Sequence, residues 1–381
     1  MNNKAGKYIT NLTGDASYKS YKPTDLPVDI KISAKLQNKI IKTYSILSKL
    51  DALVFAIPNI DLYVSMYVRK EALLSSIIEG TQCTLDDILN PNAENNSNLD
   101  VKDVINYVKA IDYSIEQLGK TPICNRLLKQ THKILLKDVR GKEKNPGEFR
   151  KSQNWIGPSN SSIKDAKYIP PNVEDMKAAI NALETYINEQ NDDIDLLLKI
   201  GLIHYQFETI HPFLNGNGRI GRLLITLLLI ENKILSKPVI YISYFLKKNQ
   251  IEYYNQMSEV RRTGNYEMWL EFFVDALYES SKDSLETVEK LIKLHNKNSN
   301  KLVETNRKKD NLRQVFEYIE QYPIINITDT AKDLNISYNT VVTCIDKLVE
   351  LKILKPTNKQ LRNKIYAYEE YLDILRKDTN F

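Results

Sequence analysis

Residues 211–222, which read HPFLNGNGRIGR, are the most informative part of this sequence. Its glycines and asparagines open a helix, and an apolar run with helical character continues that helix to Ile230. Backbone N–H groups at the amino end of a helix point toward one place, and the helix dipole adds positive potential there. An anion such as a phosphate is the expected ligand at this position.

Charged side chains in the same stretch add chemistry to this anion site. Arg219 and Arg222 are three residues apart and share a helix face, so both can fork onto phosphate oxygens. His211 comes just before the glycines and titrates near neutral pH, as a general base must. Each feature alone has an ordinary explanation: a turn, a satisfied histidine or solvated arginines. Together, in this order, they predict transfer of a phosphate-containing group.

The stretch resembles the motif of the Fic family, His-x-Phe-x-acid-Gly-Asn-Gly-Arg-x-x-Arg, and departs from it only at Asn215, where the family usually has Asp or Glu. The resemblance covers roughly residues 20–290, with an appended C-terminal module that many relatives share. Fic proteins mostly transfer AMP from ATP to a Ser, Thr or Tyr hydroxyl of a protein. The resemblance therefore implies a mainly α protein, with a Fic-type helical core, a small β-hairpin flap and a C-terminal winged helix-turn-helix domain.

The resemblance also assigns roles to residues. His211 would be the catalytic base, and the ATP-binding residues would be Asn215, Gly216, Asn217, Gly218, Arg219, Arg222 and Tyr254. Among these, Arg219 and Arg222 would hold the β- and γ-phosphates. Family members use Mg²⁺ or Mn²⁺, usually held by the acid that is Asn215 here. An amide oxygen carries no charge, so we expect weaker metal binding or ligation that relies on the phosphates.

A second stretch, SSIIEGT at residues 75–81, resembles the inhibitory motif of the family, Ser/Thr-x-x-x-Glu-Gly/Asn. On its own, Glu79 is a solvated side chain at a helix end, where the helix dipole slightly disfavours it. The resemblance implies that Glu79 pairs with Arg222, occupies the γ-phosphate site and misplaces ATP, while Ser75 anchors the helix. Low basal activity is therefore expected.

Apolar residues recur at spacings of three and four along most of the chain, which predicts helices over 29–50, 60–78, 101–118, 124–136, 173–190, 194–209, 219–230, 250–261 and 266–294. Residues 147–171 interrupt this pattern and predict a β-hairpin around a polar loop. The alternative interpretation of the same residues is a surface loop between two helices. The resemblance to the Fic family implies that this hairpin is a flap, which holds the target chain as an added strand. Its target-positioning residues would be Ser152, Gln153, Asn154, Trp155 and Ile156.

The C-terminal part follows a charge-rich linker at 293–310. Helical patterns at 312–321, 327–334 and 337–351, followed by alternation over 353–368, resemble a winged helix-turn-helix. Its third helix would present Tyr338, Asn339, Thr340, Thr343 and Lys347 outward. We therefore predict an N-terminal helical region at 1–110, a Fic core at 111–296 and a C-terminal module at 297–381.

Charge favours a protein partner for this module over DNA. Residues 301–381 hold 14 Lys and Arg against 12 Asp and Glu, and affinity for DNA grows with the number of phosphates that a protein neutralises. Winged helices also serve as protein-docking or dimerisation surfaces, so a homodimer is among the expected assemblies. The net charge of the whole chain, +5 over 381 residues, does not imply nucleic acid either.

Composition places the chain among cytoplasmic proteins of two or three domains. Its three cysteines have neither metal-site spacing nor a disulfide framework, which suits a reducing compartment. The first residues lack the apolar core of a signal peptide, and the apolar run 223–230 is too short to span a bilayer. No membrane partner is expected.

Other functions remain open at this point. The same fold can transfer phosphate, or can remove AMP with Glu79 as the base for water. A nucleotide-sensing transcription regulator that binds DNA through its C-terminal module is a third alternative. A metal hydrolase using His204 and His211 has no standard zinc spacing. The intact Gly-Asn-Gly-Arg-x-x-Arg favours AMP transfer.

Overall fold

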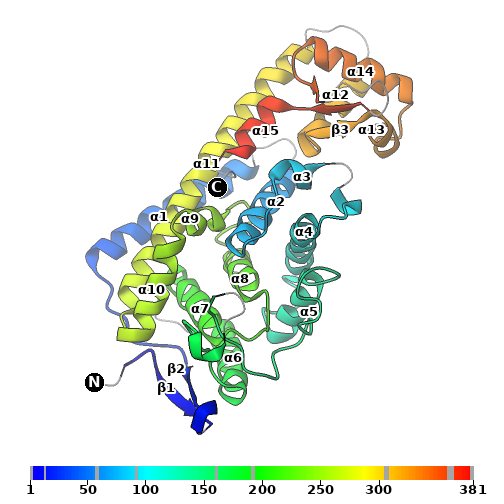
Figure 1. Ribbon diagram of the computed structural model, residues 1–381. Coiled ribbons are helices and arrows are strands. Elements are labelled where there is room, and N and C mark those ends of the chain that lie inside the picture. Colours follow the sequence, from blue (N-terminus) through cyan, green and yellow to red (C-terminus); the bar gives the residue numbers. More distant parts are fainter. Residues whose placement is uncertain are drawn as a thin grey trace. The chain divides into compact units, whose positions relative to one another are not determined.

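Helices make up most of the computed structural model (Figure 1), which describes residues 3–12, 14–55, 60–90, 93–158, 162–189, 194–303, 309–357 and 364–377. The chain divides into two units. The first unit contains Met1–Leu47, Asn106–Ser236 and Phe245–Ser280, and the second contains Ser48–Ile105, Lys237–Tyr244 and Ser281–Phe381. The predicted division into three regions at 110 and 296 stays a prediction.

The first unit is built around two neighbouring helices, α7 (Leu196–Ile210) and α8 (Asn217–Glu231), which lie side by side (Figure 1). Nearly every residue of α7 is buried, because its apolar side chains surround the helix instead of forming one stripe. Gly221 allows the close approach of the two helices, since a Cβ atom there would collide with Glu208 Oε1. The helices that belong wholly or partly to this unit besides these two are α1 (Ala34–Phe55), α4 (Leu99–Gln117), α5 (Asn125–Leu135), α6 (Val173–Asn188), α9 (Ile242–Lys248), α10 (Gln250–Thr263) and α11 (Tyr266–Val303).

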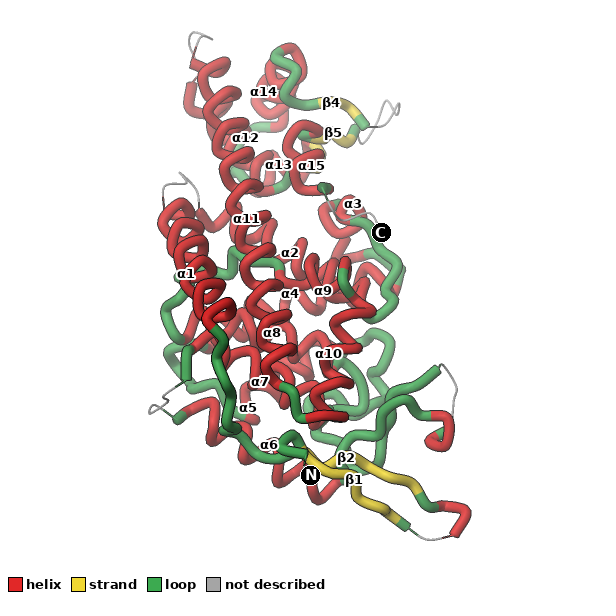
Figure 2. Tube along the Cα trace, turned by 90° about the vertical axis from the view of Figure 1, so that its left-hand side faces the viewer, coloured by secondary structure: helices red, strands yellow, loops and turns green. Residues whose placement is uncertain are grey.

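An N-terminal β-hairpin, which the sequence patterns did not reveal, also belongs to the first unit (Figure 2). Its antiparallel strands β1 (Gly6–Asn11) and β2 (Tyr18–Pro23) pair from Gly6↔Pro23 to Asn11↔Tyr18. The Tyr21 amide donates to the carbonyl of Ile169 at 2.9 Å, and the Tyr18 hydroxyl donates to Gln153 Oε1 at 3.3 Å. The hairpin therefore packs against the stretch 147–171.

The β-hairpin predicted within 147–171 is reduced to one antiparallel bridge, Ile156↔Tyr168, and a 3-10 turn, Ile163–Asp165, lies between the two halves. Longer strands would need successive backbone N–H groups, and Pro158, Pro170 and Pro171 have none. The stretch is instead held by hydrogen bonds from side chains to carbonyl oxygens, described below.

The second unit joins N-terminal helices to the C-terminal module. It contains α2 (Ile60–Ile78), whose bounds were predicted, together with α3 (Leu85–Leu89) and the short turn η2 (Ala93–Asn95). The module contains α12 (Lys309–Gln321), β3 (Ile324–Asn326), α13 (Ile327–Asp333), α14 (Tyr338–Glu350), β4 (Lys355–Pro356), β5 (Ile365–Ala367) and α15 (Glu369–Arg376). Its three strands are antiparallel in the order β3-β5-β4.

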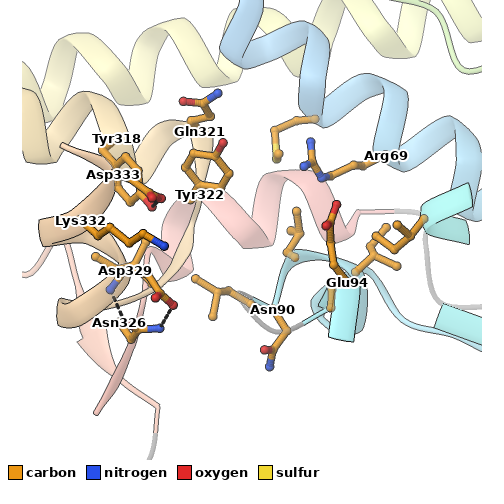
Figure 3. Close-up of a pocket in the computed structure, with 17 residues that line it drawn as sticks. Arg69, Asn90, Glu94, Tyr318, Gln321, Tyr322, Asn326, Asp329, Lys332 and Asp333 are labelled. Atoms are coloured by element: carbon orange, nitrogen blue, oxygen red, sulfur yellow. Dashed lines mark hydrogen bonds between the residues drawn. The ribbon is translucent and has the colours of Figure 1, made fainter. Parts of the chain in front are cut away.

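The observed elements of the module follow the predicted order of three helices and a two-stranded wing, with β3 and α15 in addition. The assignment to the winged helix-turn-helix class stays a prediction. A cavity of about 310 Å³ lies within the second unit, and Figure 3 shows Arg69 and Glu94 on one wall and Asp329, Lys332 and Asp333 on the facing wall. The module and the α2–α3 segment are thus neighbours.

Among the residues that the structure describes, none of the helices combines the length and the apolar character that crossing a bilayer requires. Helix α11 runs to Val303, nine residues beyond its predicted end, because the polar stretch after Leu294 continues the helix instead of ending it.

Candidate active site

The loop between α7 and α8 carries the motif and is closed by one side chain. His211, the C-cap of α7, adopts the left-handed conformation (φ 51°), and so does Gly216 (φ 78°), the N-cap of α8. The Asn217 side chain accepts the Phe213 amide and donates to the Phe213 carbonyl, both at 2.8 Å. Asn217 therefore has a structural role in shaping the loop, in addition to the nucleotide contact predicted for it.

The amino end of α8, where the sequence predicts an anion site, combines an uncapped helix end with two buried arginines. Gly216 has no side chain that could cap the helix, so the first N–H groups of α8 point out of its amino end. Arg219 and Arg222 are only 3% and 1% exposed. Charges in such a water-poor environment act on an anion more strongly than they would in bulk water. Asn215, in contrast, is exposed.

One ring nitrogen of His211 is engaged by the backbone of the preceding helix. Its Nδ1 lies 3.3 Å from the carbonyl oxygen of Glu208. A carbonyl only accepts, so Nδ1 carries a proton, and in the neutral ring Nε2 carries the lone pair that a general base needs. The carbonyl of His211 accepts from Arg150 Nε at 3.0 Å, which fixes the backbone of the same residue.

His132, which the sequence did not identify, supports the loop from α5. Its ring stacks on Phe213 with centroids 3.8 Å apart. Its Nδ1 accepts the Gly147 amide at 2.9 Å, so its Nε2 donates to the Asn215 carbonyl, also at 2.9 Å. Burial lowers the pKa of His132 to about 4, and the ring is neutral at pH 7. No local pattern could reveal a contact between residues 83 apart in the chain.

His204 connects α7 to both α8 and α10. Its Nε2 is 2.8 Å from the Tyr253 hydroxyl, and its Nδ1 donates to the Gly221 carbonyl at 2.9 Å. Burial lowers its pKa to about 3. With both ring nitrogens engaged, His204 gives no support to the metal-hydrolase alternative. Tyr254, the next residue on α10, is 45% exposed with its ring 5.1 Å from that of Tyr253.

The chain offers little to a metal ion at this site. Within the described ranges, no three His, Cys, Asp or Glu side chains gather as a set of metal ligands. Asn215 brings one neutral amide oxygen, whereas Mg²⁺ prefers carboxylate and phosphate oxygens. The protein side chains alone therefore do not fit a resident metal.

The predicted flap residues divide into anchors and exposed side chains. Asn154 Nδ2 donates to the Phe213 carbonyl at 2.9 Å, and Gln153 Nε2 donates to the Pro170 carbonyl at 3.0 Å. Ser152 is exposed, and Trp155 and Ile156 are 40% and 42% exposed. Of the five, only these last three are exposed.

Arg150, another residue that the sequence did not identify, connects the flap to the motif. Its guanidinium, 1% exposed, donates to the carbonyls of His211, Ser152 and Pro171, and its amide donates to the Pro212 carbonyl at 2.9 Å. Burial lowers the pKa of Arg150 to about 10, so the side chain stays charged at neutral pH.

Ser75 and Glu79, the predicted inhibitory residues, belong to the second unit. Ser75 is fully buried within α2, and Glu79 is exposed one residue beyond the end of that helix. Gly80 follows with φ 91°, and the amides of Glu79 and Gly80 donate to the Ser76 and Ile77 carbonyls. The pairing of Glu79 with Arg222 stays a prediction.

Comparison with known proteins places the site in a family. The model of the Fic/DOC family matches residues 122–229, and the model of the N-terminal region of that family matches residues 37–116. The protein adenylyltransferase Fic of Drosophila grimshawi is 28% identical over 225 residues, which cover 54% of this chain and 42% of the relative. A probable protein adenylyltransferase of Aquifex aeolicus is 36% identical over 78 residues, or 20% of this chain and 24% of the relative.

The chain thus spans less than half the length of these curated relatives. Solved structures agree on the fold. A Fic family protein from Desulfovibrio desulfuricans superposes with a TM-score of 0.58 at 17% identity, covering 89% of this chain and 97% of that one. A Fic domain containing signaling protein from Bacteroides thetaiotaomicron gives 0.53 at 18% identity, covering 66% and 97%. On these grounds residues 37–116 and 122–229, the second of which contains the 211–222 motif, form a Fic/DOC family region of this chain.

Proposed function

We propose that this chain is a protein adenylyltransferase, which moves AMP from ATP to a Ser, Thr or Tyr hydroxyl of a target protein and of itself. The observation that carries the proposal is the placement of His211, with Nε2 as its basic nitrogen, six residues before the uncapped amino end of α8. A base beside an anion site is the arrangement that phosphoryl-group chemistry requires. The relatives named above are adenylyltransferases, which supports the same activity.

In the proposed step, the target hydroxyl oxygen attacks the α-phosphorus of ATP. His211 Nε2 accepts the hydroxyl proton as the new O–P bond forms, and the bond from the α-phosphorus to the bridging oxygen breaks. Pyrophosphate leaves with the electron pair of the broken bond. The N–H groups at the amino end of α8 stabilise charge on the phosphates, and no covalent enzyme intermediate is needed.

Two arginines and one tyrosine complete the proposed nucleotide site. Arg219 and Arg222 would hold the β- and γ-phosphates and direct the leaving pyrophosphate away from the nucleophile. Tyr254 would contact adenine, a role that its exposure and its link through Tyr253 and His204 to α8 support. Mg²⁺ or Mn²⁺ would arrive with ATP and rely mainly on phosphate oxygens, with the Asn215 amide as a weak ligand.

The same chain would hold its own inhibitor. A carboxylate at Glu79 forked onto Arg222 would compete with the γ-phosphate and keep basal transfer low. The exposed position of Glu79 at the end of α2 supports this role, because its carboxylate is not buried within its own unit. Ser75, fully buried, would hold α2 in register.

Labelled ATP tests the activity and the inhibition together. We expect Glu79→Gly to raise incorporation of the adenylyl group into the protein itself and into lysate proteins. We expect His211→Ala, made in the Glu79→Gly protein, to lower the transfer rate about 10²–10⁴-fold while ATP still binds. Retained transfer in the double variant would exclude His211 as the base, and unchanged labelling in Glu79→Gly would exclude the inhibition.

Mass spectrometry separates this proposal from its closest alternatives. A mass gain equal to an adenylyl group on the target supports it, whereas a phosphoryl gain indicates a phosphotransferase. Release of AMP from a target that was modified beforehand, lost in Glu79→Gly, would instead indicate de-AMPylation with Glu79 as the base.

For the C-terminal module we propose a protein-docking role, as the charge count suggests. On α14, Tyr338, Asn339 and Thr343 are exposed as predicted, but Asp346 and Glu350 are exposed beside them. Lys347 pairs with Glu350 at 2.8 Å, which lowers the positive charge available to DNA phosphates. A mobility shift of promoter DNA at low salt that disappears without the module would favour the transcription-regulator alternative instead.

A further inference from the structure

A basin of about 630 Å³ in the first unit has no role in the proposed reaction. It lies between α5, α6 and the loop that leads into the flap, and this volume is within the range of ligand sites. Four cations and one carboxylate line it: Arg126, Lys129, Lys151, Lys177 and Glu148.

Most of this positive charge has no partner among the described residues. Lys129 Nζ approaches Glu148 Oε2 at 3.4 Å, but no carboxylate of the described chain pairs with Arg126, Lys151 or Lys177. All three of these side chains belong to exposed residues.

Two of the carboxylates nearby on α6 are engaged elsewhere, so these two do not neutralise the basin. Asp175 pairs with Lys22 of the N-terminal hairpin at 2.6 Å. Glu184 accepts the backbone amide of Asn125 at 3.2 Å. The side chains that line the basin thus keep an excess of positive charge, with four cations against the one carboxylate of Glu148.

The basin connects directly to the candidate active site. Lys151 is the residue before Ser152, where the flap begins. Phe149 forms part of the basin, lies under the Lys129 ammonium at 4.8 Å, and packs on Phe213 of the motif with ring centroids 5.1 Å apart. A chain held along the flap thus has the basin as its neighbour.

We propose that this basin docks an acidic stretch of the target protein, so that hydroxyls flanked by Asp or Glu are the preferred acceptors. The proposal rests on the proposed adenylyl transfer and names a class of substrate for it. Backbone pairing along the flap places a hydroxyl without reading its neighbours, whereas unpaired cations at one end of the flap select for opposite charge. Such a contact mainly affects encounter and binding, and leaves the chemical step unchanged.

Peptide kinetics with the Glu79→Gly variant of the 381-residue chain test the proposal. Two synthetic peptides share a central Ser-Thr-Tyr core, one flanked by Asp and Glu and the other by Asn and Gln. We expect the acidic peptide to have a KM about tenfold lower with similar kcat, and the difference to shrink as salt rises. Adding Arg126→Glu and Lys177→Glu should remove this preference.

A matched control keeps the net charge change the same. Lys42→Glu and Lys290→Glu alter two exposed helix lysines outside the basin and should leave the KM difference in place. Equal KM values for the two peptides, or an equal effect of the control pair, would overturn the proposal.

Direct binding separates this inference from the activity itself. The anisotropy of a fluorescent acidic peptide is measured with His211→Ala protein, which needs no turnover. We expect the Kd to rise about tenfold when Arg126→Glu and Lys177→Glu are added. Loss of transfer with retained acidic-peptide binding would overturn only the proposed enzyme. Single-stranded DNA that competes fully with the peptide at physiological salt would show a nucleic-acid surface and overturn the basin proposal.

Discussion

At position 215 the chain carries a neutral amide where the Fic motif that it resembles has an acid, and the structure leaves this residue exposed. The backbone of Asn215 is held by His132, so a change of side chain does not disturb the loop. The side chain at this position can therefore be exchanged to test metal binding without changing the fold.

We expect Asn215→Asp to lower the Mg²⁺ concentration that gives half-maximal transfer by about threefold or more, because a carboxylate adds a charged oxygen ligand. This Mg²⁺ concentration is measured by titrating Mg²⁺ into transfer assays with variants that also carry Glu79→Gly. Asn215→Gln, which stays neutral, is the control and should not show the gain. If Asp and Gln behave alike, the residue is not a ligand.

Arg150 is a buried residue whose planar side chain reaches three carbonyls at once. A lysine keeps the charge but cannot match this fork. We expect Arg150→Lys to cost about 2 kcal/mol of unfolding free energy, since buried carbonyls lose their donors. Urea unfolding measures the loss. Arg126→Lys, an exposed and equivalent exchange, should change stability little.

At the scale of elements, periodicity predicted the helices well because most are amphipathic or wholly apolar. Helices α2 and α10 begin at the predicted residues, and the bounds of α7 differ by one or two. The N-terminal hairpin was not predicted, because apolar and polar residues alternate only weakly along its strands and because distant partners such as Ile169 hold it. Long-range contacts of this kind leave no local signal.

The candidate site shows the same division. His211 and the two arginines could be proposed as site residues because they are close together in sequence. His132 and Arg150 could not, since each is brought to the motif by the packing of another element. The roles of Asn154 and Asn217 as loop anchors also depend on backbone carbonyls, which carry no sequence identity.

Helices α5 and α7 each bury one neutral histidine, and this predicts a pH dependence of stability. The pKa values of His132 and His204 are lowered to about 4 and about 3 by burial, whereas an unfolded chain protonates histidine near 6.5. Below pH 6.5 the unfolded state binds more protons, so stability falls as the pH falls.

Each of these histidines should remove about 2 kcal/mol of stability at pH 5 relative to pH 7.5. Urea unfolding at several pH values measures the slope for the wild type, His132→Gln and His204→Gln. The variants will be less stable at pH 7.5, but their free energy of unfolding should depend less on pH. An unchanged slope in both variants would show that neither ring is held neutral.

At the scale of whole units, the C-terminal module is fastened to the segment that follows Glu79. Arg376 of α15 forks onto Asp86 of α3 with Nε–Oδ1 at 2.8 Å and Nη2–Oδ2 at 2.7 Å. Lys70 of α2, 2% exposed, donates to the Lys377 carbonyl at 2.9 Å. The turn at 79–84 therefore lies between two helices that α15 holds.

A double-mutant cycle over this pair tests the coupling. We expect Asp86→Ala and Arg376→Ala each to speed hydrogen exchange of the amides at 75–90, and the double variant to add little, with a coupling of about 0.5–1 kcal/mol. Lys297→Ala, which breaks the exposed pair with Glu370 on the same α15 helix, is the control and should leave these amides unchanged. Because the Glu79 turn precedes α3 directly, we also expect Arg376→Ala to raise self-labelling, though less than Glu79→Gly does. Additive effects in the cycle would mean that the module and the inhibitory segment are energetically independent, whatever their contact.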